Sequence, residues 1–467
     1  PPRRHPHRSD PVTAMPSTKR PNILFLFSDQ QRWDTLGCYG QPLPVSPCLD
    51  HLARGNTLVQ HAFTCQPVCG PARAALQTGR YPTEVGCPTN HRLLPEDTET
   101  IAKLLRASGY ECGYLGKWHL ASCGPHDGPD NFREKGVPPK RRGGYDDYWL
   151  ASDTLEFTSH GYDGHMFDAE GNKRHFPKGR FRADAQTDWL LEYLDTRTLE
   201  KPFFLFNSWI EPHHQNDRHR YEGPHDSLTR FGDFVTPGDL VGTGGDWKRE
   251  YPDYLGCCAS LDANVGRILA KLDERGIRDN TIIIYTSDHG SHFKTRNGEY
   301  KRSCHDGCIR VPMILAGGPF AGGHAPTGLA SLIDLPPTVL RAAGVDVPEW
   351  MRGRPLQDLV AGADDWQDDV FLQISESQCG RALRTQRWTY SVRAPEAGRG
   401  SDTHASAYVE DFLYDNATDP HQKVNRVADP DLSAVRADLR QRLLQRMASV
   451  GEPPATISPA LTGAAKG

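Results

Sequence analysis

Short apolar runs alternate with amphipathic stretches from residue 22 onward. The apolar runs are rich in aromatic and β-branched residues, a pattern that favours strands buried on both faces. They lie at 22–27, 110–119, 202–209 and 281–290. The stretches between them have apolar residues at helical spacing, at 99–109, 184–196 and 261–276. Helices that alternate with buried strands predict an α/β fold, with a large, mostly parallel mixed sheet sandwiched by helices.

The pattern changes near residue 364. Shorter strand-like segments follow at 370–375, 388–393 and 407–415, before an amphipathic helix at 432–450. We therefore interpret the C-terminal part as a small α+β domain with an antiparallel sheet. The predicted organisation is a flexible basic tail at 1–20, a main domain at 21–364, and the C-terminal domain with its loose tail at 365–467.

Two long polar stretches interrupt the alternation of helix and strand. Residues 121–180 and 211–250 are rich in Gly, His, Arg and Asp. Loops of that length inside a compact domain are usually functional. We expect both to shape a binding site.

Composition excludes several classes of protein. The chain has 467 residues, of which 37% are hydrophobic and 24% charged, and its formal net charge is −5. That charge is too close to neutral for a nucleic-acid surface or a polybasic membrane anchor. No apolar run approaches the ~20 residues that a membrane span needs, and the first 20 residues lack the apolar core of a secretory signal. We expect no nucleic-acid or membrane partner, twelve cysteines as free thiols, and a cytoplasmic location.

Polar side chains that bear useful chemistry follow each predicted strand of the main domain. Along the chain they are Asp29 and Gln30, Lys117 and His119, His213, then Asp288 and His289. The carboxyl ends of parallel strands meet at one edge of a sheet, so these side chains are expected to share one crevice. For Asp288, the structural alternative is a helix N-cap.

These residue types suit a metal and an anion. Two carboxylates with an amide and an imidazole could bind a divalent cation, and the oxygen ligands favour Ca²⁺. The nitrogen of His289 leaves Mn²⁺ or Zn²⁺ open. Lys117, His119 and His213 have the chemistry to hold an anionic group and to move protons at its leaving oxygen.

The segment 65–80, CQPVCGPARAALQTGR, carries the most specific motif. Its Cys69-Gly70-Pro71-Ala72-Arg73 core resembles the signature of the type I sulfatases. In that family the Cys of a C-x-P-x-R core is oxidised to formylglycine, whose hydrated aldehyde attacks sulfur. Further segments resemble the family in order over residues 21–426: PNILFLFSDQQRWDTLGCYG, GYLGKWHL, WIEPHH, YTSDHG, EYKRSCHDGCIRVPMIL and LYDNATDPHQKVN.

The resemblance implies an alkaline-phosphatase-like fold, with residues 21–364 as the sulfatase domain, and a role for each matching residue. Metal ligands would be Asp29, Gln30, Asp288, His289 and an oxygen of the modified Cys69. Arg73 would steady position 69, while Lys117, His213 and Lys301 would grip the sulfate. His213 and Lys301 would also assist the departing alcohol, and His119 would deprotonate the second hydroxyl of the hydrate. A formylglycine-generating enzyme would be a partner during maturation.

Two positions depart from the commoner sulfatase pattern. Gln30 stands where many sulfatases have a second Asp, and His289 where they have Asn. The same pairs beside C-G-P-A-R resemble phosphonate monoester and phosphodiester hydrolases. We expect hydrolysis of an organic sulfate monoester, a sulfated carbohydrate or similar small molecule, with phosphonate monoester or phosphodiester hydrolysis as the alternative. A binding protein that never matures Cys69 is a third hypothesis, which the complete set of polar residues disfavours.

Overall fold

The computed structural model describes residues 19–125, 127–398 and 402–460 of the chain. The N-terminal tail predicted at 1–20 therefore lies almost wholly outside the described residues. Arg20 is described, and its guanidinium donates to the Ser108 carbonyl at 2.5 Å.

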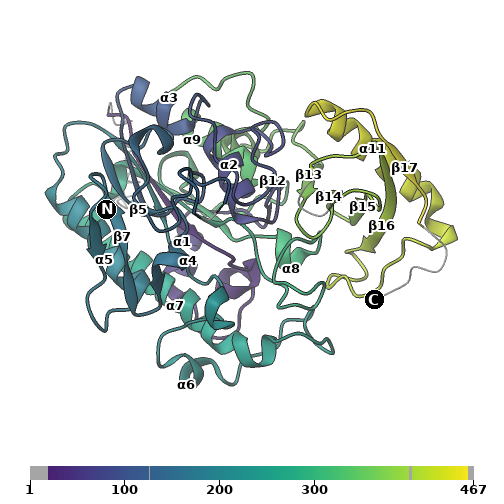
Figure 1. Cartoon of the computed structure of the whole chain (residues 1–467), viewed down its shortest axis with the longest axis horizontal. Helices are drawn as coiled ribbons and strands as arrows, with labels where there is room; N and C mark the ends of the chain where they lie inside the picture. The colour runs from purple at the N-terminus through teal and green to yellow at the C-terminus, as the bar shows by residue number, and fades with distance from the viewer. Residues whose placement is uncertain (1–18, 126, 399–401, 461–467) are drawn as a thin grey trace, which may run out of the picture.

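A ten-stranded mixed sheet forms the centre of the larger part of the molecule (Figure 1). Its five central strands, β10, β1, β9, β4 and β5, are parallel, and the flanking pairs on both sides are antiparallel. In spatial order the strands are β2 (Thr57–Leu58), β11 (Met313–Ala316), β10 (Thr281–Ser287), β1 (Asn22–Ser28), β9 (Phe203–Ser208), β4 (Glu111–Lys117), β5 (Tyr148–Ser152), β7 (Asp163–Asp168) and β6 (Ser159–His160), with β8 (Lys173–His175) paired to β7. The predicted mostly parallel mixed sheet is confirmed.

Helices cover both faces of this sheet, as the continuously apolar strands require. Along β1, Ile23, Phe25 and Phe27 pack into one core cluster, whereas Leu24 and Leu26 pack into another. The first cluster includes residues of α2 (Cys69–Thr78), α3 (Ile101–Ala107) and α9 (Leu335–Ala342). The second includes residues of α1 (Pro47–Gly55), α5 (Arg182–Thr196) and α7 (Trp247–Glu274). The sheet is thus the middle layer of a sandwich.

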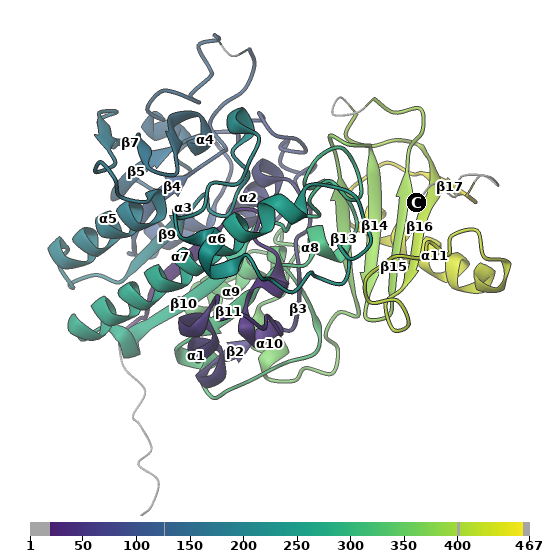
Figure 2. The same ribbon diagram turned by 90° about the horizontal axis from the view of Figure 1, so that it is seen from below.

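The C-terminal part is a smaller α+β unit beside the main sheet (Figure 2). Its five strands lie in sequence order: β13 (Asp369–Ile374), β14 (Gly380–Thr385), β15 (Trp388–Arg393), β16 (Ala407–Asp415) and β17 (Thr456–Ser458). All neighbours are antiparallel except β16 and β17, which are parallel. Leu439, Leu443 and Met447 of α11 (Ser433–Ser449) pack against this sheet.

The structure corrects both predicted loops. The stretch 121–180 contains β5, β6, β7, β8 and the short helix α4 (Leu155–Thr158). The helix predicted at 261–276 begins at Trp247, so the stretch 211–250 ends in its first turn and also holds α6 (Ser227–Phe231). Polar residues and Pro252 obscured the start of α7 in the sequence. The strands β6 and β8 have two and three residues, too few to show an alternating pattern in the sequence.

The remaining short elements join the two sheets. Strands β3 (His61–Phe63) and β12 (Leu329–Ser331) form a parallel pair, and α8 (Asp306–Ile309) and α10 (Leu356–Val360) lie in connections. All twelve cysteines are free thiols, as predicted. Among the helices of the described residues, none is long and apolar enough to cross a membrane.

Candidate active site

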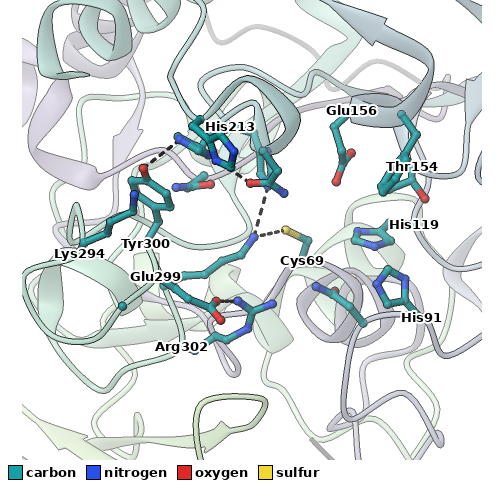
Figure 3. Close-up of a pocket in the computed structure, with 18 residues that line it drawn as sticks. Cys69, His91, His119, Thr154, Glu156, His213, Lys294, Glu299, Tyr300 and Arg302 are labelled. Carbon is teal, nitrogen blue, oxygen red and sulfur yellow. Dashed lines mark hydrogen bonds and ion pairs between the residues drawn. The ribbon is translucent and has the colours of Figure 1, made fainter. Parts of the chain in front are cut away.

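The carboxyl ends of β1, β4 and β9 and the first turn of α2 meet at one cavity of about 470 Å³. Its wall includes Gln30, Cys69, His119, His213 and Lys301 (Figure 3). Hydrogen bonds and ion pairs join these side chains to the other predicted site residues: Asp29, Arg73, Lys117, Asp288 and His289. The structure therefore brings together residues that are up to 272 positions apart in the sequence, from 29 to 301.

Four buried side chains in this site could hold a metal ion. One ligand atom from each of Asp29, Cys69, Asp288 and His289 lies within 4.8 Å of the others. The Cys69 Sγ is 3.3 Å from Asp29 Oδ1 and 3.2 Å from His289 Nε2, and it stands in for an oxygen of a modified residue. Asp288 Oδ2 is buried without a hydrogen-bond partner among the described residues. Two carboxylates, one of which has an oxygen without a hydrogen-bond partner among the described residues, and an imidazole are ligands that suit a divalent cation.

Gln30 is placed beside this group by its backbone. Its N–H donates to Asp288 Oδ1 at 2.9 Å, and its φ of +70° is a left-handed conformation that costs a non-glycine residue about 1–2 kcal/mol. Its side-chain amide N–H donates to the Tyr221 hydroxyl at 2.7 Å. That bond leaves the amide oxygen as the atom that could reach a cation.

The two carboxylates have opposite electrostatic surroundings. Asp29 Oδ2 lies 2.9 Å from Lys117 Nζ and 3.0 Å from an Arg73 nitrogen. Burial raises the pKa of Asp29, but Lys117 and the other nearby cations outweigh it and hold this pKa well below its usual value. Burial, and next the charge of Asp29, raise the pKa of Asp288 to about 7. Arg73, 3.5 Å from Asp288 Oδ2, and Lys301 lower this pKa without offsetting the rise.

Arg73 ties the α2 helix to two strands of the sheet. One guanidinium nitrogen donates to the Lys117 carbonyl and to the Ser208 hydroxyl, each at 2.7 Å, and the other binds Asp29. Gly116 permits the close approach of β4 to β9, because a Cβ there would lie 1.9 Å from the Ser208 carbonyl oxygen. Together these contacts fix Lys117 and Cys69 relative to each other.

Lys301 is the cation closest to position 69. Its Nζ lies 2.8 Å from the Cys69 Sγ, 3.3 Å from His289 Nε2 and 3.4 Å from His213 Nε2. Burial lowers the pKa of Lys301, but Cys69 and Asp29 outweigh it and raise this pKa above its usual value. Burial, and next Asp29, raise the pKa of the Cys69 thiol to about 12, so the unmodified thiol is protonated at neutral pH.

His119 follows β4 with a φ of +63° and lines the same cavity. Both of its ring nitrogens are buried and lack a hydrogen-bond partner among the described residues. Burial, and next Lys117, hold its pKa well below the usual value, so the imidazole is neutral. Such a ring can accept a proton from a group that enters the cavity.

Four residues that sequence reasoning missed also belong to the site. The Gly70 N–H donates to Asn90 Oδ1 at 2.9 Å, and the Asn90 N–H donates to Glu376 Oε1 at 2.5 Å. Glu376 comes from the loop between β13 and β14 and also pairs with Arg302. Glu156 of α4 lies 3.1 Å from Lys117. Arg302 lies in the quoted segment EYKRSCHDGCIRVPMIL, and Glu156 lies in the stretch 121–180 that was expected to shape a binding site, but neither residue was singled out. Asn90 and Glu376 lie outside the predicted helices and strands and outside the quoted segments.

Comparison with known proteins agrees with this geometry. The sulfatase family profile matches residues 21–345, and the profile of the C-terminal region of N-sulphoglucosamine sulphohydrolase matches residues 298–449. An ulvan-active sulfatase from Formosa agariphila is 26% identical, with 93% of this chain and 82% of that protein aligned.

Solved structures share the fold. A protein in complex with its substrate D-glucosamine-2-N,6-O-disulfate aligns with a TM-score of 0.73 at 22% identity, covering 92% of this chain and 98% of that one. The phosphonate monoester hydrolase of Agrobacterium radiobacter aligns with a TM-score of 0.68 at 22% identity, covering 92% and 96%. With a family profile matched over most of its length, the chain belongs to the sulfatase family of the alkaline phosphatase superfamily and is a sulfuric ester hydrolase.

Proposed function

We propose that this protein hydrolyses a sulfate monoester of a carbohydrate, with a formylglycine made from Cys69 as the nucleophilic residue. The observation that carries the proposal is the arrangement around Sγ, which is contacted by Lys301, Asp29 and His289 within 3.3 Å. A formylglycine-generating enzyme would act on the chain during maturation. The hydrate of formylglycine would supply one hydroxyl to attack sulfur and a second whose deprotonation releases sulfate.

The surrounding residues would hold the ester and manage its protons. Lys117 and Lys301 present two ammonium groups to the non-bridging sulfate oxygens. His213, whose Nε2 is 3.4 Å from Lys301 Nζ, would work with Lys301 to protonate the departing alcohol oxygen as the S–O bond breaks. His119, whose two ring nitrogens have no hydrogen-bond partner among the described residues, would take the proton from the second hydroxyl.

The cation would be held by Asp29, Asp288, His289 and residue 69, with the amide oxygen of Gln30 in reach. Its positive charge would compensate the two carboxylates and the sulfate. Ca²⁺ is the first choice because oxygen ligands predominate, while the His289 nitrogen also suits Mn²⁺ or Zn²⁺. Chelation followed by add-back of single metals should restore turnover with the native ion. Full activity in a metal-free protein would contradict the assignment.

A phosphonate monoester or phosphodiester is the second candidate substrate. It carries the same single charge, and the Gln30 and His289 pair fits this chemistry as well as sulfate chemistry. Such a substrate, however, needs room for a second substituent on phosphorus, which a sulfate monoester does not carry. We rank the sulfate monoester first because it requires less space beside position 69.

The test compares kcat/KM for an aryl sulfate, a sulfated monosaccharide and an aryl phosphonate monoester on one enzyme batch. We expect the sulfated monosaccharide to have the highest value. A phosphonate value above both sulfates would make the second candidate the correct one.

A further inference from the structure

One carboxylate in the cavity has an oxygen that no described residue pairs with by a hydrogen bond. Glu156 lies on α4, and only 8% of its side chain is exposed. Its Oε1 is 3.1 Å from Lys117 Nζ, but its Oε2 is buried without a hydrogen-bond partner among the described residues. Figure 3 shows Glu156 on the same side of Cys69 as Thr154 and His119, across from Tyr300 and Lys294.

The unsatisfied oxygen indicates what a ligand must bring to it. A buried carboxylate oxygen without a donor is costly, and a sulfate group cannot supply the donor because its oxygens only accept. Of the two halves of a sulfate ester, only the alcohol half can supply that donor. Lys117 contacts Glu156 and, on the proposed function, the sulfate, which places the carboxylate next to the sulfate position.

Two neighbours of Glu156 complete a surface suited to a sugar ring. The Thr154 hydroxyl also lines the cavity and is buried without a partner among the described residues. Phe157 lines the same wall, with 47% of its side chain exposed and the Arg133 guanidinium 5.4 Å from its ring centroid. A hydroxyl, a carboxylate and an exposed aromatic side chain can bind the polar edge and the apolar face of a pyranose.

We propose that Thr154, Glu156 and Phe157 form a subsite that selects a sugar with a free hydroxyl on the carbon next to the sulfate ester. Glu156 Oε2 accepts the hydrogen bond of that hydroxyl, and Phe157 packs against the ring. The subsite rests on the proposed sulfate monoester hydrolysis and names the substrate class for it.

A purely structural role for Glu156 explains less of the geometry. Lys117 is already held by Asp29 at 2.9 Å, so it does not need a second carboxylate to fix it. Holding Lys117 would also use only one of the two Glu156 oxygens. The subsite accounts for both.

The experiment pairs enzyme variants with two substrates. The substrates are the methyl glycoside of a monosulfated hexopyranose, in the regioisomer that is turned over fastest, and its deoxy analogue without the neighbouring hydroxyl. Mature, metal-loaded wild type should prefer the hydroxylated sugar by about 10- to 100-fold in kcat/KM, the range of a hydrogen bond to a charged group. Glu156→Ala should bring the ratio near one, and Glu156→Gln, which keeps an acceptor, should retain part of it.

Glu299→Ala is the matched control, because Glu299 lines the same cavity but its carboxylate is paired with Arg302. It should leave the substrate ratio as in wild type. The thermal midpoint reports whether each variant is folded, and turnover of an aryl sulfate reports whether it is mature and metal-loaded.

The subsite is contradicted if Glu156→Ala keeps the wild-type ratio, or if wild type turns over the aryl sulfate but no sugar sulfate. If Glu156→Ala lowers both sugar substrates equally, Glu156 acts through Lys117 and the subsite is again wrong. If the mature wild type hydrolyses no sulfate ester at all, the proposed function itself fails.

Discussion

Glu376 offers a test of whether the C-terminal unit takes part in the active site. Its Oε1 accepts the Asn90 N–H at 2.5 Å, and Asn90 Oδ1 accepts the N–H of Gly70, the residue after Cys69. Glu376 also pairs with Arg302, which follows Lys301. Glu376, a side chain of the β13–β14 loop, is therefore linked through Asn90 to Gly70, which follows Cys69, and through Arg302 to Lys301.

Glu376→Ala should therefore lower kcat as well as stability. Loss of a hydrogen bond to a charged group costs about 1.5–3 kcal/mol. The Arg302 pair adds about 1 kcal/mol or less, since Arg302 is partly exposed and keeps Glu299. If the bond to Asn90 serves to hold Gly70, kcat should fall by about 10- to 100-fold with KM little changed. Glu376→Gln should recover part of kcat, because its amide oxygen can still accept from Asn90.

Glu452→Ala is the control for stability. Glu452 pairs with Arg381 at 2.7 Å inside the C-terminal unit, with both side chains at most 3% exposed. Breaking such a buried pair costs about 3–5 kcal/mol of unfolding free energy, but kcat per folded molecule should stay near wild type. Steady-state kinetics and urea unfolding on the same preparations measure both quantities. The positioning role is refuted if Glu376→Ala loses stability while its kcat stays at the wild-type value.

Further predictions concern a cation and a buried acid. Lys117→Ala should lower kcat/KM for an aryl sulfate by about 10²–10³-fold, since a preorganised cation at the sulfate is lost; a change below threefold in folded, metal-loaded protein would contradict its role. Burial raises the pKa of Asp334 to about 6 in the folded state. Its contribution to stability is therefore fully present below about pH 4 and is lost as pH rises through 6, by roughly 3 kcal/mol in total. Urea unfolding from pH 4 to 7 should show a smaller decline for Asp334→Asn than for wild type, and equal slopes would count against this pKa.

The sequence was sufficient to predict the site residues that lie at the ends of regular strands. Asp29, Lys117 and Asp288 could be placed together because each lies at the carboxyl end of a buried strand, and parallel strands end at one edge. The C-x-P-x-R core marked Cys69 and Arg73 through family resemblance.

Other parts depend on contacts that leave no local pattern. Glu376 meets Asn90 across 286 positions of sequence, and Glu156 lies on a single helical turn of four residues. Neither has a periodic neighbourhood that could signal its position. The start of α7 at Trp247 was missed for another reason, since tertiary packing there overrides the unfavourable Pro252.

On the proposed mechanism, residue 69 is a formylglycine in the active enzyme. Mass spectrometry of the peptide that contains Cys69-Gly70-Pro71-Ala72-Arg73, on protein with measured sulfatase turnover, tests it most directly. The peptide should be lighter than encoded by the mass of one water molecule, ~18 Da, as expected for conversion of the thiol to an aldehyde. Only the unmodified thiol in a fully active preparation would contradict it.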